Sequence, residues 1–187
     1  KTDAEPPRLE VYARGMRNAY GFCWNDAGEM FATENGPDAD APEELNHIEE
    51  GRHYGFPYRF ADWTKKAYPT SPEPPAGLAF TLPVANLGPD GGFSGTPMFT
   101  FDPHSGPGGI VFLGKEFPEG YRGTFLLTRF GNFIRSPKEN SGFDVLRATL
   151  RRNAEGRYEG HFHTVLSGLG RPIDIHQGAP GKLYIDR

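Results

Sequence analysis

The chain has little of several features that would narrow its class. Its 187 residues include one cysteine, Cys23, so no disulfide can form within the chain. Cys23 lies in an apolar run and is expected to be a small buried side chain. The net charge of −4 gives no indication of a nucleic-acid partner. No hydrophobic run is long enough to cross a bilayer, and residues 1–7 lack the apolar core of a signal peptide, so any export signal would lie elsewhere or have been removed.

Glycine, proline and aromatic residues are abundant instead. The 25 glycines, 18 prolines and 13% aromatic residues predict many short strands joined by tight turns, as in a sandwich, barrel or propeller. We expect one short helix over 42–50, since Pro42 suits a helix start and Gly51 a helix end. A Pro/Gly-rich excursion over 63–95 is predicted to be a long loop or insertion within a single domain covering 1–187. Strands are expected at 9–14, 19–24, 29–33, 98–101, 110–113, 123–128, 144–150, 161–166 and 182–185.

A faint internal repeat favours a radial arrangement of these strands. Gly28, Gly123 and Gly181 each follow a turn and precede one residue and then an apolar–aromatic pair. The first two glycines are about two repeats apart at the usual propeller period of roughly 40–45 residues, and the second step fits less well. The sequence therefore predicts an all-β partial propeller of about three blades with long loops and little helix. Three blades cannot close a ring, so the remaining blades must come from the same precursor or a second copy.

The segment from Asn35 to Asn46 is the strongest candidate for chemistry. Gly36 and Pro37 form a corner in which proline removes a backbone donor, so consecutive carbonyls can face one point. Backbone oxygens with nearby carboxylates are the ligands that Ca²⁺ prefers. The spacing differs from that of an EF-hand loop, and a solvated acidic loop is the alternative interpretation. The candidate carboxylates are Asp38, Asp40, Glu43 and Glu44.

Four motifs in this order resemble the soluble pyrroloquinoline quinone (PQQ)-dependent glucose/aldose-sugar dehydrogenase and sorbosone dehydrogenase family. They are Gly15-Met16-Arg17-Asn18-Ala19-Tyr20-Gly21-Phe22, Thr33-Glu34-Asn35-Gly36-Pro37, Glu44-Leu45-Asn46-His47-Ile48 and Gly51-Arg52-His53-Tyr54-Gly55-Phe56-Pro57. The resemblance covers the C-terminal half of the family's domain, and the excursion at 63–95 is unmatched. It implies a six-bladed propeller, periplasmic or secreted, with PQQ and Ca²⁺ as cofactors and a sugar as substrate.

The resemblance also implies roles for individual residues. The carbonyls of Gly36 and Pro37 would hold the catalytic Ca²⁺, whereas Glu44 and the carbonyl of Tyr54 would hold a structural one. Arg17 and Asn18 would lie near the substrate. Arg171 and, by a looser alignment, Arg129 would bind the carboxylates of PQQ.

The departures from the family pattern concern catalysis. A histidine base would take the sugar hydroxyl proton as hydride passes to the quinone, yet none of the six histidines here falls in the corresponding motif. Ile173 stands where the family has a second arginine, which weakens the PQQ site and leaves the calcium sites intact. We therefore expect no catalytic residue in this chain and no turnover by it alone. A calcium-dependent sugar-lactone hydrolase and a non-catalytic propeller binding domain are the alternatives.

Overall fold

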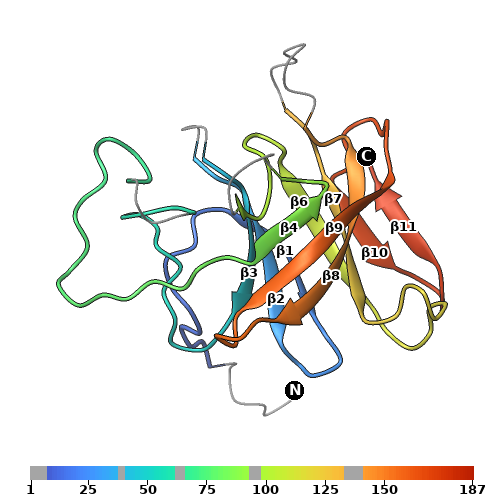
Figure 1. Cartoon of the computed structure of the whole chain (residues 1–187), viewed down its shortest axis with the longest axis horizontal. Coiled ribbons are helices and arrows are strands. Elements are labelled where there is room, and N and C mark those ends of the chain that lie inside the picture. Colours follow the sequence, from blue (N-terminus) through green and yellow to red (C-terminus); the bar gives the residue numbers. More distant parts are fainter. Residues whose placement is uncertain (1–7, 38–40, 62–65, 93–97, 133–140) are drawn as a thin grey trace, which may run out of the picture.

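The computed structural model describes residues 8–37, 41–61, 66–92, 98–132 and 141–187 (Figure 1). These ranges contain eleven strands and no helix, so the all-β prediction is confirmed. The described part of the chain accordingly offers no helix able to span a membrane. The strands are β1 (Ala19–Trp24), β2 (Met30–Glu34), β3 (Glu44–Ile48), β4 (Ala85–Pro89), β5 (Met98–Phe99), β6 (Pro107–Leu113), β7 (Thr124–Arg129), β8 (Asp144–Arg152), β9 (Tyr158–Leu166), β10 (Asp174–Gln177) and β11 (Leu183–Asp186).

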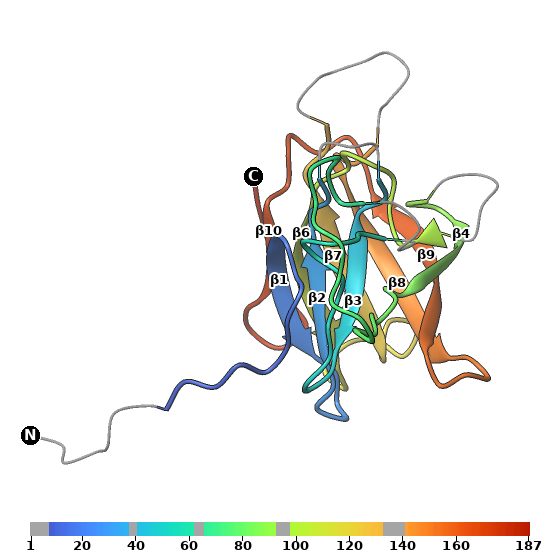
Figure 2. The ribbon, with the colours of Figure 1, turned by 90° about the vertical axis from the view of Figure 1, so that its left-hand side faces the viewer.

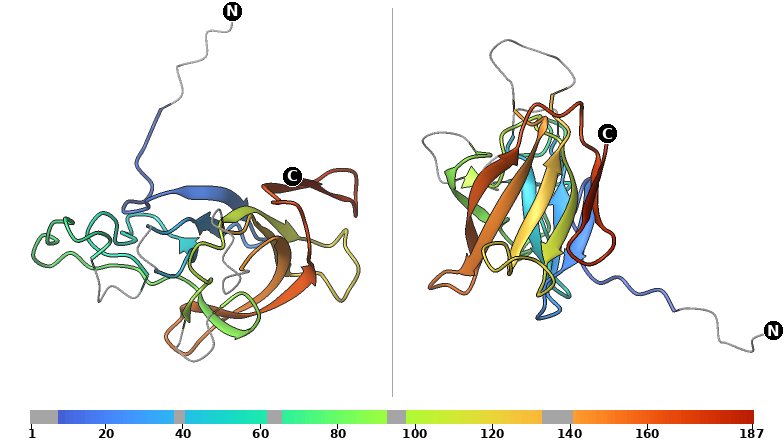
Figure 3. Two further views of the ribbon diagram at one scale, coloured as in Figure 1. Left: turned by 90° about the horizontal axis from the view of Figure 1, so that it is seen from above. Right: turned by 90° about the vertical axis from the view of Figure 1, so that its right-hand side faces the viewer.

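The strands form three sheets that correspond to blades of a propeller. The first blade is the antiparallel sheet β1-β2-β3, and β6-β7-β8-β9 is the antiparallel meander of the second. Strands β4 and β5 extend the second blade, with β4 parallel to β9. The third blade is represented by the hairpin β10-β11. Seen along the strand ends, the excursion after β3 lies on one side and β10-β11 on the other (Figure 3, left).

The three glycines of the internal repeat occupy equivalent places. Gly28, Gly123 and Gly181 have φ values of 77°, 72° and 73°, a backbone region that suits glycine, and each lies just before the second strand of its blade. The register also repeats, since β1-β2 and β6-β7 both carry an irregularity near their first residues. The repeat seen in the sequence is thus the structural repeat of the blades.

Neighbouring blades are joined by a repeated hydrogen bond. Thr33 Oγ1 of β2 donates to Gly108 O at 2.5 Å, and Thr128 Oγ1 of β7 donates to Ile173 O at 3.1 Å. In each case a threonine of one blade bonds to the next blade, at Gly108 within β6 or at Ile173 directly before β10. The backbones are close here, because a Cβ on Gly21 would lie 2.7 Å from Gly108 O.

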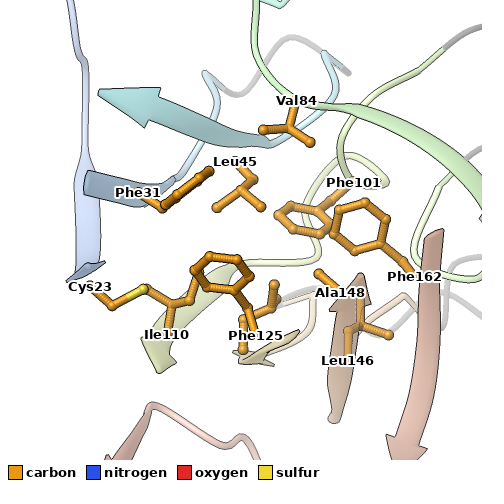
Figure 4. Packing of buried hydrophobic residues seen from close by; sticks show 11 residues of the cluster. Cys23, Phe31, Leu45, Val84, Phe101, Ile110, Phe125, Leu146, Ala148 and Phe162 are labelled. Carbon is orange, nitrogen blue, oxygen red and sulfur yellow. The ribbon is translucent and has the colours of Figure 1, made fainter. Parts of the chain in front are cut away.

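The main hydrophobic core lies between the first two blades. Figure 4 shows phenylalanine rings from both blades packed around Leu45, which is fully buried. Phe31 of β2 stands 4.7 Å from Phe125 of β7 between ring centroids, which fixes the two sheets face to face. The cluster comprises Cys23, Phe31, Leu45, Val84, Phe101, Ile110, Phe125, Leu127, Leu146, Ala148 and Phe162, and includes the cysteine expected to be buried.

The opposite face of β1 is open. The aromatic side chains of Phe22 and Trp24 on this face are 45% and 57% exposed. Phe22 in β1 and Ile110 in β6 occupy equivalent places, because each is the first paired residue after the register irregularity of its strand. Ile110 is buried because the first blade covers it. The exposed aromatics therefore mark the face where a preceding blade would pack.

Two local predictions are wrong. Residues 44–48 form strand β3 rather than a helix, because β2 supplies a complete antiparallel ladder from Glu34 to Met30. The helix-like spacing of Leu45 and Ile48 is incidental. Residues 9–13 form no strand. Of the expected strand, only Arg14 forms a β-bridge, to His53, and residues 9–13 belong to an arm that extends away from the sheets (Figure 2).

The described part of the excursion at 63–95 is bonded to the first blade and to the turn that precedes it. It supplies β4, which the sequence did not indicate, and Val84 N donates to Leu45 O at 2.8 Å across the first blade. Lys66 and Arg59 both pair with Glu73 at 2.8 Å, which ties residues 66–73 back to the preceding turn. The excursion thus covers the outer side of the first blade.

Candidate metal and cofactor site

The predicted calcium corner lies at the end of β2 where the chain turns towards β3, at the upper end of the first blade in Figure 2. Pro37 is buried and Gly36 partly so, and the nearest atoms to a Cβ on Gly36 include Phe60 Cε1 and the carbonyl oxygens of Ala41 and Pro42. The corner therefore faces protein rather than bulk solvent. Asp38 and Asp40, two of the carboxylates proposed from sequence, lie outside the described residues.

Two carboxylates are buried together directly beneath this corner. Glu34 and Glu44 are paired across β2 and β3, and each is only 1% exposed. Asn46 Nδ2 donates to both, at 3.0 Å to Glu34 Oε2 and 2.9 Å to Glu44 Oε2. One amide group is thus the shared neighbour of two acids that are both removed from water.

Burial and mutual repulsion change how this pair ionises. Burial raises the pKa of Glu34 to about 7, although the backbone N–H groups of Arg17 and Asn18 that it accepts oppose the shift. Burial, and then the Glu34 charge, raise the pKa of Glu44 well above its ordinary value, although Glu44 Oε1 accepts the Ala61 N–H at 2.7 Å. The pair retains a proton near neutral pH unless a cation replaces it.

The oxygen atoms around this acid pair fit a hard cation. Asn46 is fully buried, and its Oδ1 has no hydrogen-bond partner among the described residues, whereas its Nδ2 donates to two carboxylates. An unpaired amide oxygen beside two carboxylates is the donor set that Ca²⁺ prefers. Among the described residues no group of three or more His, Cys, Asp or Glu is arranged to hold a metal. The ligands would therefore combine two acids with neutral oxygens.

Glu43 points to the other side of β3. Its Oε2 accepts the Gly36 N–H at 3.1 Å, and its backbone pairs with Phe101. Burial raises the pKa of Glu43 to about 7, against the backbone N–H groups of Gly36, Gly106 and His104, which lower it. Glu43 is therefore bound to the backbone of two loops and is separate from the Glu34–Glu44 pair.

Arg17 and Asn18, predicted near the substrate, lie beside the corner. The Arg17 guanidinium donates to Asn35 O at 3.1 Å and to the Tyr68 hydroxyl at 2.9 Å. Asn18 is exposed, and its carbonyl accepts the Asn35 N–H at 3.1 Å. The structure thus brings both residues to the predicted calcium corner, and contact with substrate stays a prediction.

Tyr54 is buried, but its side chain points to the far end of β3. Its hydroxyl donates to His47 O at 2.6 Å and accepts the Glu49 N–H at 2.8 Å, away from Glu44. The ligand role proposed for Tyr54 concerns its backbone carbonyl and stays a prediction.

The two predicted cofactor arginines are held differently. Arg129 is 4% exposed and makes a two-pronged contact with Asp144, Nε–Oδ1 at 2.9 Å and Nη2–Oδ2 at 2.7 Å, with Asp102 at 3.7 Å. Its charge is therefore already matched within the protein. Arg171 has a φ of 60°, its Nη2 donates to Asn132 O at 3.3 Å, and its guanidinium lies 4.8 Å from the centroid of the Phe130 ring. Cofactor binding by either arginine stays a prediction.

No site role was predicted from the sequence for Glu34 or Asn46, and the bonds of Glu43 to the backbone of two loops were not predicted either. Glu34 lies within a quoted motif, but a carboxylate in an apolar strand was not recognised as buried. In the structure Glu34 and Asn46 fall on the same face as fully buried Ala32, but the sequence does not reveal this, because β2 and β3 are buried on both faces and show no alternation.

The chain matches a known protein family along almost its whole length. A model of the family described as Glucose / Sorbosone dehydrogenase matches residues 2–186. No curated protein sequence matches the chain.

Several solved structures are similar in fold. An oxidoreductase (glucose dehydrogenase) from Thermus thermophilus is 24% identical, with a TM-score of 0.61 over 98% of this chain and 43% of that one. The PQQ-bound aldose sugar dehydrogenase from Streptomyces coelicolor is 21% identical, with a TM-score of 0.60 over 99% and 41%. The calcium structure of a Carbohydrate-Active Enzymes Family AA12 protein from Trichoderma reesei is 18% identical, with a TM-score of 0.61 over 93% and 50%. The chain spans half or less of each of these structures.

Proposed function

Because the chain belongs to the glucose/sorbosone dehydrogenase family, we propose that it is the C-terminal part of a PQQ- and calcium-dependent dehydrogenase of aldose-type sugars. The observation that carries the proposal is the buried Glu34–Glu44 pair with the unpartnered Asn46 Oδ1 beside it. Two buried acids that repel each other are costly even with the Arg17 charge acting on Glu34, and a bound divalent cation offsets that cost. The names of the solved relatives support the same two cofactors.

In this proposal the chain supplies the calcium sites and part of the cofactor site. The carbonyls of Gly36 and Pro37 hold one Ca²⁺, and Glu44 with the Tyr54 carbonyl holds the second. Arg171 binds a carboxylate of PQQ, whereas the charge of Arg129 is paired with Asp144 inside the protein. Ca²⁺ and PQQ would supply a Lewis acid and a hydride acceptor when bound.

The remaining work falls to residues outside this chain. The base that takes the sugar hydroxyl proton would come from the other blades, which pack on the open face of β1. Arg17 and Asn18 would orient the sugar from this side. We also propose that the whole protein is exported, as the resemblance implies. The chain alone should bind Ca²⁺ and should not oxidise sugar.

Thermal unfolding of the chain with and without Ca²⁺ tests the first half of the proposal. After EDTA treatment at pH 7.5, adding Ca²⁺ to about 100 times its Kd should stabilise the fold by about 2.7 kcal/mol and raise Tm. Mg²⁺ at the same concentration should do less, because it demands a tighter octahedral site. Glu44→Gln should remove most of the shift, and Glu119→Gln on the surface should keep it. An unchanged Tm on Ca²⁺ addition to the native sequence would refute calcium binding.

A PQQ titration separates the dehydrogenase from its alternatives. The pairing of Arg129 with Asp144 favours a calcium-binding propeller that does not hold PQQ, as in a lactone hydrolase or a binding domain. If the proposal is right, PQQ absorbance changes saturably with Ca²⁺ present, and Arg171→Ala weakens the response. Complementation with the N-terminal half of a family member should then restore dye-linked aldose oxidation. Calcium binding without any PQQ response would support the two alternatives and contradict the proposal of a dehydrogenase.

A further inference from the structure

The peptide that precedes the calcium corner is held from both sides. Its N–H, on Gly36, donates to Glu43 Oε2 at 3.1 Å, and its C=O, on Asn35, accepts from Arg17 Nη1 at 3.1 Å. The N–H and C=O of a trans peptide point in opposite directions, so the two bonds together fix the orientation of its plane. The next two carbonyls along the chain are those of Gly36 and Pro37.

Glu43 also holds a loop of the second blade. The backbone N–H groups of His104 and Gly106 face its carboxylate, and both residues have a φ of 61°. Backbone N–H groups converge around an anion when residues adopt such left-handed conformations. The glycine-rich loop therefore closes on an internal carboxylate.

The same loop returns to the corner by a second route. Asn35 Nδ2 donates to Pro107 O at 3.1 Å, one residue beyond the Gly106 N–H group that faces Glu43. The backbone of Glu43 is fixed as well, since its N–H and C=O both bond to Phe101 at 3.1 and 2.9 Å. Glu43 is thus held in place between the Asn35–Gly36 peptide and loop 104–106, and it is 5% exposed.

We propose that Glu43 is a positioning residue for the calcium corner, fixing the Asn35–Gly36 peptide against loop 104–106 so that the Gly36 and Pro37 carbonyls stay aimed at one point. This inference rests on the proposed function, which makes those carbonyls ligands. Glu43 acts through the backbone and does not itself contact the ion. Replacing residues that orient metal ligands commonly weakens affinity by about 10–100-fold.

Two variants separate positioning from charge. Glu43→Asp keeps the negative charge but is too short to reach both loops, whereas Glu43→Gln keeps the length and loses one acceptor oxygen. We expect both to raise the calcium Kd, measured calorimetrically on the full chain, by about tenfold or more. Glu29→Gln is the matched control, because Glu29 bonds Arg152 and Tyr158 at the other end of the first blade, and its Kd should stay unchanged.

Amide hydrogen exchange supplies a readout that needs no metal. In calcium-free protein, Gly36 and Gly106 should lose protection in both Glu43 variants while the β7 and β8 amides keep theirs. A Glu43→Asp variant with native Kd would overturn the inference, and an equal loss in Glu29→Gln would reduce it to general instability. If the native chain binds no calcium, the proposed function fails first. If the native chain binds and the Glu43 variants bind equally well, only this inference fails.

Discussion

Two equivalent places in the first and second blades carry opposite electrostatic arrangements. Glu34 and Arg129 are each the sixth residue after the hairpin glycine of their blade, and each pairs across the sheet with an acid. In the second blade the pair is Arg129 with Asp144, a salt bridge closed within the protein. In the first blade the pair is Glu34 with Glu44, two acids with only an amide between them.

The difference indicates which blade is suited to bind an ion. A buried arginine and aspartate neutralise each other and need nothing from solution. Two buried glutamates must hold a proton or a cation, and Asn46 leaves an oxygen unused beside them. The same position in the repeat is therefore structural in one blade and suited to binding in the other.

The largest effect is expected from breaking the closed pair. Arg129→Met leaves Asp144 buried without its partner, and we expect the free energy of unfolding to fall by about 3–5 kcal/mol. Urea unfolding at pH 7.5 measures this loss. Arg151→Ala, which breaks a largely exposed pair with Glu159, should cost less than about 1 kcal/mol.

The double variant Arg129→Met with Asp144→Leu sharpens the test. Replacing both charges with apolar side chains should recover most of the loss, because the penalty comes from the unpaired acid. A double variant as unstable as Arg129→Met alone would mean that packing, rather than charge, accounts for the cost.

The open acid pair should make the calcium-free fold less stable as pH rises. Burial raises the pKa of Glu34 from 4.5 to about 7, so the folded state binds more protons than the unfolded state between these values. Stability from this group is complete below pH 4.5 and is lost by about pH 7, a change on the order of 3 kcal/mol. Chemical unfolding in EDTA from pH 5 to 7.5 measures the slope.

Two additions identify the source of that slope. Glu34→Gln should reduce it, because the amide does not titrate, although Glu43 and Glu44, whose pKa values burial also raises, keep a slope of the same sign. Saturating Ca²⁺ should also reduce it, since the ion replaces the proton. Stability that rises from pH 5 to 7.5 in EDTA would contradict the assignment of the acid pair as the dominant titrating group.

Much of the fold could be predicted because its signals are local. Gly28 and Gly123 lie in turns whose flanking predicted strands pair with each other, whereas β10, the strand before Gly181, was not predicted. The third strand of the first blade was mistaken for a helix because Leu45 and Ile48 lie three apart between Pro42 and Gly51. Its inward face is polar, so the alternation that identifies a strand is hidden. Strand β4 was missed because its sequence is rich in turn residues and its partner β9 is distant in the chain.

The site was only partly predictable for a similar reason. The Gly36-Pro37 corner follows from motif resemblance and from the conformations that glycine and proline favour. The burial of Glu34 does not, since a strand ending in a carboxylate usually exposes it. The clamp by Glu43 depends on a loop more than sixty residues downstream, near His104, and only the packing of two blades brings these segments together.

The smallest expected effect concerns the threonines that join the blades. Thr33 Oγ1 both donates to Gly108 O and accepts the Gly21 N–H at 3.0 Å, whereas within the described ranges Thr128 Oγ1 bonds only to Ile173 O. Thr33→Val should therefore cost about 2 kcal/mol and Thr128→Val about 1 kcal/mol, because an orphaned buried group costs about 1–3 kcal/mol. The two valines match threonine in shape, so packing is the same in both variants and urea midpoints can be compared directly. A larger loss for Thr128→Val would mean that the contact with the third blade, short as that blade is here, stabilises the fold more than the contact between the two complete sheets. The inequality thus tests whether the first and second blades form the rigid unit on which the acid pair and the corner are built.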